Sequence, residues 1–471
     1  MIAAEQLKGL AAALSARLCG ENAPVTSISI DTRTIEPGQL FVALKGPNFD
    51  GHDYSETALA KGAAGVLVSE DRGLVPALLV EDTDAALAQT AILNRDAFNG
   101  TVLGVTGSSG KTSVKEMLAA IFAKVAPTLA TIGNLNNGYG VPVTLARLTK
   151  EHRYAVIEMG TNSSGEIAHL TKLVRPHIAM INNASISHVE GLGSLMGVVE
   201  EKGAIYDLLG KQGTAVVNLD DVHCDIWRKR INENAGCRVL TFSLSNAAAT
   251  SWPSDIVTDE EGTSFMLHLA GEQAPVRLQF WGKHQVANAC AAAAMAHAAG
   301  LDIQTIANGL ALAQPYARRG QRFRTAGGAM VIDESYNANP DSTCAAIDAL
   351  VECSGQRILV LGELSKEHYL TQKEGIRMHQ ELGEYALNAG VDQILTCGVL
   401  SSHVHDTFLK GGKHFSEKNA LIDWLKPQLQ AGTVVLVKGS MLTGMDEVVK
   451  ACLADSTPAE VAGGIETREG F

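Results

Sequence analysis

The sequence predicts an α/β protein of three domains, and three observations support this fold class. A chain of 471 residues is long enough for about three domains. Short apolar runs rich in valine and isoleucine alternate with stretches whose apolar residues recur every three or four positions, as in parallel sheets with connecting helices. A glycine-rich turn lies between one such strand and one such helix. We expect a small α/β domain at 1–97, a central phosphate-loop domain at 98–313 and a Rossmann-like domain at 314–471.

Composition narrows the possible partners and the location of the protein. The net charge is −13 and no long basic run occurs, so neither nucleic acid nor an anionic membrane is expected as a main partner. No uncharged apolar stretch reaches 18 residues, so we expect no membrane span. The eight cysteines are scattered without a Cys-x-x-Cys pair, which favours reduced thiols in a cytoplasmic protein without a zinc site.

The first unit is expected to hold an opening helix, two early strands and a terminal linker. The first 18 residues could be mistaken for a signal peptide, but Glu5 and Lys8 lie early in it and Ser15 and Arg17 interrupt the apolar run, so an amphipathic helix is expected instead. Strands are expected at 27–33 and 39–44, separated by a Glu-Pro-Gly turn. Helical and strand-like segments follow, and a linker near 94–100 leads into the second unit.

The second unit begins with the pattern of a phosphate-binding loop. A buried strand is expected at 102–105, and the apolar residues of 114–125 repeat as one face of a helix. Glycines between them let backbone N–H groups close around phosphate oxygens, with Lys111 for the terminal phosphates and Thr112 for Mg²⁺. Val105 stands where the common motif has its first glycine, so a glycine-rich turn with a chance lysine is the alternative. The expected phosphate-binding residues are Gly107, Ser108, Ser109, Gly110, Lys111, Thr112 and Ser113.

Two further strands of the second unit lead into candidate ligands. The strand expected at 154–158 ends in Glu158, a position that often holds Mg²⁺ in nucleotide-binding sheets, although an ordinary strand-terminal acid is the alternative. A strand at 178–181 is followed by His188; a lone histidine is usually structural, but this one lies just past a strand end, where ligands of open α/β sheets collect. The other expected elements are strands at 214–218, 330–332, 358–361, 393–395 and 434–437 and a helix at 285–299.

Several stretches, in order along nearly the whole chain, match one family. They are TGSSGKTS (106–113), GNLNNGYGVP (133–142), VIEMGTNSSGEI (156–167), SHVEGLGS (187–194), EKGAIY (201–206), GKHQVANA (282–289), DESYNANPDS (333–342) and LVKGS (436–440). On these motifs the sequence resembles the Mur ligase superfamily, the ATP-dependent amide ligases of peptidoglycan synthesis. The resemblance implies that ATP, with one or two Mg²⁺ ions, converts a carboxylate to an acyl phosphate that an amine then attacks.

The resemblance also implies roles for residues on these motifs. Lys111 and Thr112 would bind ATP phosphate and Mg²⁺, while Glu158 and His188 would be metal ligands. Lys202 matches the family lysine that is carbamylated, because an ammonium beside Mg²⁺ would be repelled whereas a carbamate is an anionic oxygen ligand. From the residues alone, Lys202 resembles any helix-surface lysine, and no general base is apparent unless His188 is free of metal. Residues implied near adenine, phosphate and ribose are His284, Asn288, Arg322 and Asp333.

Other motifs imply the substrates. Asp31–Thr32 and Asn48–Phe49 match a pair of uridine-binding loops, so the first domain would bind a UDP moiety; the phenyl ring would stack on uracil or, alternatively, belong to the core. The segment with Tyr336, Asn337 and Asn339 resembles the branch that adds D-alanyl-D-alanine, because the Asp-Asn-Pro-Arg motif of diaminopimelate-adding ligases is absent. We therefore expect UDP-N-acetylmuramoyl-tripeptide and D-alanyl-D-alanine as substrates of a monomeric enzyme.

Three departures from the family pattern stand out. Glu334 replaces a second aspartate, and Met441 follows Lys-Gly-Ser where the family usually has arginine, so a phosphate contact by that arginine is lost or moved. The stretch GELSKEH at 362–368 replaces a Gly-Asp-Met-x-Glu-Leu pattern, so the contacts of that loop cannot be carried over.

Three other functions are considered. A kinase or motor ATPase is disfavoured by the shortened loop, by Glu158 in place of the usual aspartate and by the additional first domain. A binding protein with an inactive site is disfavoured by the complete set of implied ligands. Folylpolyglutamate synthase, within the same superfamily, is not expected to carry the SYNANP segment or the uridine loops.

Overall fold

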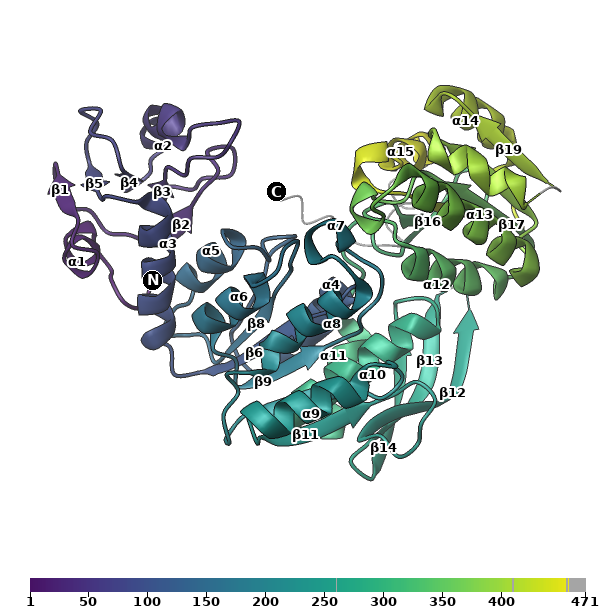
Figure 1. Ribbon diagram of the computed structural model, residues 1–471, viewed down its shortest axis with the longest axis horizontal. Coiled ribbons are helices and arrows are strands. Elements are labelled where there is room, and N and C mark those ends of the chain that lie inside the picture. Colours follow the sequence, from purple (N-terminus) through teal and green to yellow (C-terminus); the bar gives the residue numbers. More distant parts are fainter. Residues whose placement is uncertain (260, 409–410, 455, 457–471) are drawn as a thin grey trace.

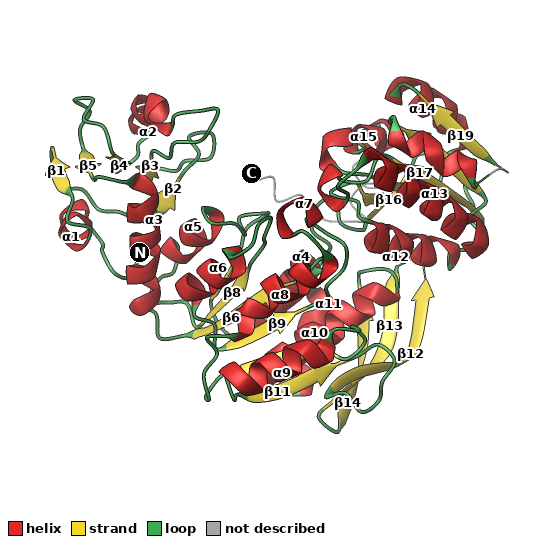
Figure 2. Ribbon diagram, viewed as in Figure 1, coloured by secondary structure: helices red, strands yellow, loops and turns green. Residues whose placement is uncertain are grey.

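The computed structural model describes residues 1–259, 261–408, 411–454 and 456, and this part of the chain forms three lobes (Figure 1). Each lobe contains one sheet, and the central lobe lies between the first and the third. Most neighbouring strands in the three sheets are parallel, and helices cover the sheets (Figure 2). The expected α/β class with three domains is therefore confirmed, while the boundaries at 97 and 313 stay predictions.

The first sheet has the order β1-β5-β4-β3-β2, in which β1 is antiparallel to β5 and the other neighbours are parallel. The expected opening helix is confirmed but ends at Ala13, because the chain turns back into β1. The expected strands at 27–33 and 39–44 are confirmed in shorter form as β2 and β3. The elements are α1 (Leu7–Ala13), β1 (Arg17–Cys19), β2 (Ile28–Ser29), β3 (Leu40–Val42), η1 (Gly51–Tyr54), α2 (Ser55–Ala60), β4 (Gly65–Val68) and β5 (Ala77–Leu79).

Helix α3 (Thr83–Asp96) joins the first lobe to the central lobe. Asn94 in its last turn is fully buried; its side-chain oxygen accepts from the N–H of Ile2 (2.6 Å) and its amide donates to the carbonyl of Leu145 (2.7 Å). The linker expected near 94–100 is therefore wrong in its first part. The polar residues there satisfy buried backbone groups within a helix, and the connection to the next strand is only 97–100.

The central sheet has the order β14-β13-β12-β11-β10-β9-β6-β8-β7. Every pair of neighbours from β7 to β12 in this order is parallel, whereas β12 with β13 and β13 with β14 are antiparallel. The strands expected at 154–158, 178–181 and 214–218 are confirmed, but the antiparallel extension was not expected. Its strands bury mainly alternate residues, so they carry no continuous apolar run.

The elements of the central lobe after α3 are β6 (Thr101–Thr106), α4 (Lys111–Ala123), β7 (Thr128–Ala130), α5 (Gly140–Ala146), β8 (Tyr154–Glu158), α6 (Glu166–Val174), β9 (Ile178–Ile181), α7 (Val189–Leu192), α8 (Leu195–Gly203), η2 (Ala204–Tyr206), β10 (Thr214–Asn218), α9 (Cys224–Asn234), β11 (Arg238–Phe242), β12 (Ser251–Asp259), β13 (Gly262–Leu269), β14 (Glu272–Leu278), α10 (Lys283–Ala298) and α11 (Ile303–Leu312).

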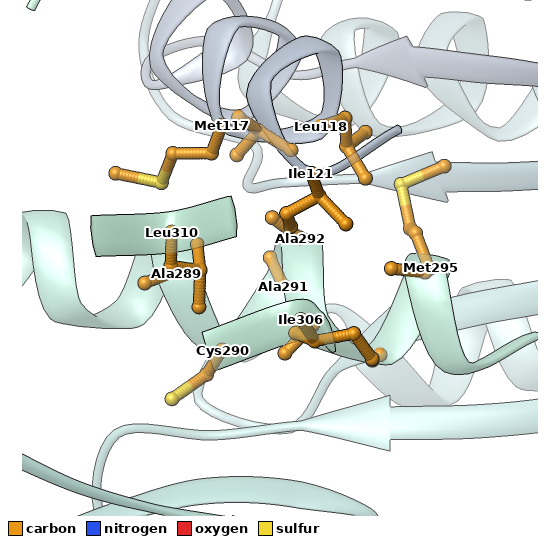
Figure 3. Close-up of a cluster of buried hydrophobic side chains, with 14 of the residues drawn as sticks. Met117, Leu118, Ile121, Ala289, Cys290, Ala291, Ala292, Met295, Ile306 and Leu310 are labelled. Carbon is orange, nitrogen blue, oxygen red and sulfur yellow. The ribbon is translucent and has the colours of Figure 1, made fainter. Parts of the chain in front are cut away.

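Helix α4 is held in place by close packing against α10 and α11 (Figure 3). Met117, Leu118 and Ile121 of α4 are fully buried against the alanine-rich face of α10. Gly309 of α11 allows the closest approach, because a Cβ there would lie 2.5 Å from the Cα of Ile121. Small residues on two helices thus let α4 lie deep in the core, which fixes the position of its N-terminus at the edge of the sheet.

The third sheet has the order β15-β16-β20-β17-β18-β19, with β15 antiparallel to β16 and the other neighbours parallel. Helices α12 and α13 pack on one face and α14 and α15 on the other, as in a doubly wound domain. All four strands expected here are confirmed, as β16, β17, β18 and β20. The expected third domain runs to 471, but 409–410, 455 and 457–471 lie outside the described residues. Within the described residues, no helix combines the length and apolar character needed to cross a membrane.

The elements of this lobe are β15 (Gln321–Arg324), β16 (Met330–Glu334), α12 (Pro340–Val351), β17 (Gln356–Leu361), η3 (Lys366–His368), α13 (Gln372–Ala389), β18 (Gln393–Cys397), η4 (Leu400–Asp406), β19 (Gly412–Phe415), α14 (Lys418–Leu425), η5 (Lys426–Gln428), β20 (Thr433–Lys438), η6 (Met441–Thr443) and α15 (Asp446–Leu453).

Candidate active site

The glycine-rich turn joins the end of β6 to the start of α4, as the motif requires. The N–H groups of Ser108 and Ser109 donate to the carbonyl and side-chain oxygens of Asn183, both at 2.9 Å. Asn183 follows β9, which is the neighbour of β6 in the sheet. The turn is therefore fixed to the sheet by an adjacent strand end, and the first turn of α4 presents its unpaired N–H groups at the same edge.

Gly110 can only be glycine in this arrangement. It adopts a left-handed conformation with φ of 76° immediately before α4. A Cβ at this position would lie 2.3 Å from Nδ2 of Asn182 and 2.5 Å from Oδ1 of Asn288. These two amides are hydrogen-bonded to each other at 2.8 Å, so neither is free to move aside. The turn thus depends on the amides of Asn182, just after β9, and Asn288, in α10, which are distant in the sequence.

Two lysines converge on the turn. Nζ of Lys111 and Nζ of Lys202 both donate to the carbonyl oxygen of Gly107, at 2.7 and 3.1 Å. Lys202 lies in α8 and is only 1% exposed, so its sequence-based description as an ordinary surface lysine is wrong. Burial lowers the pKa of Lys111, and burial together with the charge of Lys111 holds the pKa of Lys202 well below its usual range. The pair creates a strongly electropositive point at the end of the sheet.

Buried oxygen ligands lie beside the lysines. Glu158, at the end of β8, is 1% exposed; its Oε2 accepts from Oγ1 of Thr112 (3.0 Å) and its Oε1 accepts from Nδ2 of Asn136 (2.8 Å). A carboxylate and a hydroxyl in contact are ligands that Mg²⁺ prefers. Within the described residues, however, no cluster of three or more His, Cys, Asp or Glu side chains could hold a metal ion. A cation here would need a further anionic oxygen.

His188 contacts a different domain. It precedes α7 in a left-handed conformation with φ of 52°, and its Nδ1 lies 3.4 Å from Oε2 of Glu367, in the loop after β17 of the third lobe. The ring of His368 packs edge-on against the ring of His188, with centroids 5.9 Å apart. The sequence does not indicate these contacts, because they join loops of separate domains.

A cleft of about 610 Å³ opens between the central and third lobes. Its central side contains the glycine-rich turn, the ends of β9 and β10, and the start of α10; its opposite side contains the ends of β16 and β20. The cleft is lined by five of the predicted residues from outside the turn: His284, Asn288, Tyr336, Asn337 and Asn339. Burial lowers the pKa of His284, so its ring is neutral near pH 7.

Five predicted nucleotide residues do not line this cleft: Gly107, Lys111 and Thr112 of the turn, and Arg322 and Asp333 from outside it. Arg322 lies on β15 and donates to the carbonyl of Gln279 (3.4 Å). Asp333 is buried, its Oδ1 accepts from the N–H and hydroxyl of Ser335 (3.0 and 2.6 Å), and burial raises its pKa. Arg319, which was not predicted, lines the cleft instead and lies over the ring of Tyr336, 3.8 Å from its centroid.

Other lining residues were also missed. Asn182, Arg318 and Lys438 also line the cleft and were not predicted as site residues, although Lys438 belongs to the LVKGS motif. Two residues that depart from the family pattern are also placed by the structure. Glu334 accepts a hydrogen bond from Nζ of Lys438 (3.3 Å), and Met441 is 53% exposed. The position at the end of a predicted strand would have found Asn182 and Lys438, whereas Arg318 and Arg319 precede β15, which was not predicted.

The two candidate uridine loops leave the carboxyl ends of neighbouring parallel strands, β2 and β3, and so lie at one edge of the first sheet. Asp31 pairs with Arg33 (2.6 Å), and the carbonyl of Thr32 accepts from Nζ of Lys61 (2.8 Å). Asn48 is exposed, and Phe49 is 57% exposed with its ring over Gly46. The alternative that Phe49 belongs to the core is therefore wrong.

The glycine-rich turn joins a strand of a parallel sheet to a helix, and it faces a second α/β domain across a cleft. This arrangement defines a nucleotide-binding protein of the phosphate-loop class. Within that class, the chain belongs to the Mur ligase family. Family models match at 24–98 (Mur ligase family, catalytic domain), 105–296 (Mur ligase middle domain) and 318–441 (Mur ligase, glutamate ligase domain).

Individual relatives agree over nearly the full chain. The UDP-N-acetylmuramoyl-tripeptide–D-alanyl-D-alanine ligase of Escherichia coli (strain K12) is 40% identical over 447 residues, which cover 94% of this chain and 97% of the relative. MurF from Acinetobacter baumannii superposes with a TM-score of 0.84 at 32% identity, covering 93% of this chain and 96% of that chain. MurF from Thermotoga maritima, in complex with ADP, gives a TM-score of 0.77 at 26% identity, with coverage of 91% and 97%.

Gly110→Ala should abolish nucleotide binding, because a Cβ would displace the amides of Asn182 and Asn288 and distort the turn. The matched control is Gly165→Ala: Gly165 has the same left-handed conformation before α6 (φ 90°), but nothing lies within 4 Å of a Cβ there. Fluorescence titration with a labelled ADP should give no measurable binding for the first variant and wild-type binding for the second. Equal behaviour of the two variants would contradict the steric explanation.

Proposed function

We propose that this chain is an ATP-dependent amide ligase that joins D-alanyl-D-alanine to UDP-N-acetylmuramoyl-tripeptide, with release of ADP and phosphate, in the synthesis of peptidoglycan precursors. The near full-length similarity to ligases of that name carries the proposal. The site supports it, because an electropositive phosphate loop faces a polar segment of another domain across a cleft. Such a cleft can hold a nucleotide on one side and an amine substrate on the other.

The reaction needs an activated carboxylate, because a carboxylate is a poor electrophile. The tripeptide carboxylate would accept the terminal phosphoryl group of ATP and become an acyl phosphate, while Lys111 and the first turn of α4 stabilise the transferring negative charge. The dipeptide amine then attacks the acyl carbon, and the tetrahedral intermediate expels phosphate. Closure of the cleft excludes water, which would otherwise hydrolyse the acyl phosphate.

A divalent cation fits the residues beside the loop once Lys202 is carbamylated. Thr112, Glu158, His188 and the carbamate would hold one or two Mg²⁺ ions, which would neutralise phosphate charge. The Lys202 amine is buried and its pKa lies well below its usual range, which makes the uncharged form that reacts with CO₂ easier to reach than in an exposed lysine. The carbamate would supply the further anionic oxygen that the described carboxylates and imidazoles lack.

The cleft and the first sheet divide the substrates among the three domains. His284 and Asn288 would border adenine at the start of α10, while Tyr336, Asn337 and Asn339 would meet the dipeptide at the end of β16. We propose that Arg322 and Asp333 contact the phosphate and ribose of the nucleotide. Their side chains would have to leave their present contacts to do so. All of these groups come from one chain, so we propose that the enzyme is a monomer. Its eight cysteines are all described and are free thiols, so we propose that it works in the reducing cytoplasm.

The decisive assay measures phosphate release with UDP-N-acetylmuramoyl-tripeptide, ATP and one amine at a time. We expect turnover with D-alanyl-D-alanine and little with D-alanine, L-lysine or diaminopimelate. Lys111→Ala should reduce turnover by about 10²–10³-fold, because it removes a charged donor to the transferring phosphoryl group. Turnover with a free amino acid but not the dipeptide would refute the substrate, and phosphorylation of an acceptor without amide formation would refute the ligase.

Lys202→Ala should lower the ligase activity about 100-fold or more, since a cation ligand contributes several kcal/mol to stabilisation of the transition state. Intact mass measured in bicarbonate should show one carbamate on the wild type and none on the variant. Acetate should restore part of the activity of Lys202→Ala by replacing the lost carboxylate, whereas a purely structural lysine would not respond. The exposed Lys211, changed to alanine, is the control and should behave as wild type.

Phe49→Ala should raise the KM for the UDP-substrate about tenfold with little change in kcat, because aromatic–base stacking contributes about 1–3 kcal/mol. The matched control is Val75→Ala, which is equally exposed (57%) but lies before β5, at the opposite edge of the first sheet. An unchanged KM for a folded Phe49→Ala protein would place uridine elsewhere.

A further inference from the structure

The loop that departs from the family pattern, at 362–368, reaches from the third lobe to the candidate active site. It follows β17, and its η3 turn lies against α7 of the central lobe; β17 and α7 are labelled in Figure 1. Its last two residues are Glu367 and His368, which contact His188. The proposed ligase mechanism leaves both residues without a role.

The base of this loop is held firmly within the third lobe. The N–H of Ser365 donates to the carbonyl of Ala338 (3.0 Å), and its hydroxyl donates to the side-chain oxygen of Asn337. The N–H of Leu364 donates to Nε2 of His379 (3.2 Å), and both of these side chains are buried. Because its base is fixed, the tip of the loop moves with the third lobe as one body.

The tip restrains the ring of His188 from two directions. Oε2 of Glu367 lies 3.4 Å from Nδ1 of His188, a contact at ion-pair distance. The ring of His368 meets the His188 ring at an interplanar angle of 76°. His188 itself has a left-handed backbone, so its side chain leaves the central lobe in a constrained direction.

The charges around this contact are complementary. The contact with His188 lowers the pKa of Glu367, and the nearby Lys111 acts in the same direction. His368 is 1% exposed, and burial lowers its pKa to about 4. Among the described residues neither ring nitrogen of His368 has a hydrogen-bond partner, and Oε1 of Glu367 is 3.8 Å from Nε2. His368 therefore acts on His188 through packing.

We propose that Glu367 is a positioning residue that accepts a hydrogen bond from Nδ1 of His188 and thereby leaves Nε2 available to a divalent cation at the phosphate loop. A histidine ligand almost always donates its other ring N–H to such an acceptor, which fixes the tautomer and the ring orientation. Here the acceptor belongs to another domain. Cation binding and docking of the third lobe are therefore coupled, and each strengthens the other by the same factor. The inference rests on the cation site of the proposed function.

A simple domain contact is the competing explanation. It would stabilise the docked arrangement through packing and charge, and it would leave the affinity for a cation unchanged. Cation affinity therefore separates the two explanations without any measurement of ligase activity.

The test compares Glu367→Ala, Glu367→Gln and the control Lys366→Ala, which alters an exposed residue of the same turn. Free Mn²⁺ is measured by electron paramagnetic resonance during titration of each protein with ADP present. Glu367→Ala should weaken Mn²⁺ binding about tenfold. This is the lower end of the loss in metal affinity that follows removal of a histidine ligand's hydrogen-bond acceptor, because the contact here is partly exposed. Glu367→Gln should retain most of the affinity through its amide oxygen, and Lys366→Ala should match the wild type.

Small-angle X-ray scattering supplies the second readout. With Mn²⁺ and ADP present, the radius of gyration should be larger for Glu367→Ala than for the wild type. The variant should need a Mn²⁺ concentration about tenfold higher to reach the wild-type radius. Wild-type Mn²⁺ affinity in Glu367→Ala would overturn the proposal, whatever the radius. Equal losses in the alanine and glutamine variants, or a loss in Lys366→Ala, would also overturn it.

Failure of this inference differs from failure of the proposed function. If the wild type binds Mn²⁺ and ADP but ligates no amine, the proposed function fails while the coupling can still be measured. If the wild type ligates the dipeptide and Glu367→Ala binds Mn²⁺ normally, only the inference fails. A wild type that binds no Mn²⁺ with ADP would refute both the cation site and the coupling.

Discussion

The carbonyl oxygen of Gly107 accepts hydrogen bonds from two lysine ammonium groups, and much of the candidate site follows from this interaction. Two cations at one buried oxygen repel each other, and burial alone already disfavours their charged forms. The arrangement is tolerable only if negative charge lies nearby. Glu158 supplies it from the next strand, Glu367 supplies it from another domain, and a bound phosphate would supply more. An acidic chain with a net charge of −13 can therefore present a local anion site.

The geometry of parallel sheets brings the remaining groups together. Side chains that follow parallel strands emerge at one edge of a sheet, and each lobe carries its candidate residues at such an edge. In the central and third lobes, the ends of β9, β10, β16 and β20 face each other across the cleft. The glycine-rich turn depends on this arrangement, because the amides of Asn182, after β9, and Asn288, in α10, fill the space beside Gly110. The cleft is thus a consequence of the way in which two sheets meet.

Sequence reasoning predicted the parts of the fold that depend on local patterns. Strands such as 154–158 and 178–181 were predicted at their observed bounds, since each is a short apolar run buried on both faces. The antiparallel strands β12 to β14 were missed because they bury mainly alternate residues, which is a weaker signal. The linker predicted near 94–100 includes Asn94, but tertiary contacts give this residue buried backbone partners within a helix.

The sequence by itself determined the fold class, the phosphate loop and the family, because each depends on residue types at fixed spacing. Only the tertiary structure decided that Lys202 is buried against Gly107, that Phe49 is exposed and that Arg319 rather than Arg322 borders the cleft. It also brought Glu367 to His188, across 179 positions of the chain. Burial, charge and pairing between distant segments arise when separate domains pack, and no local pattern of residues records which loops will meet.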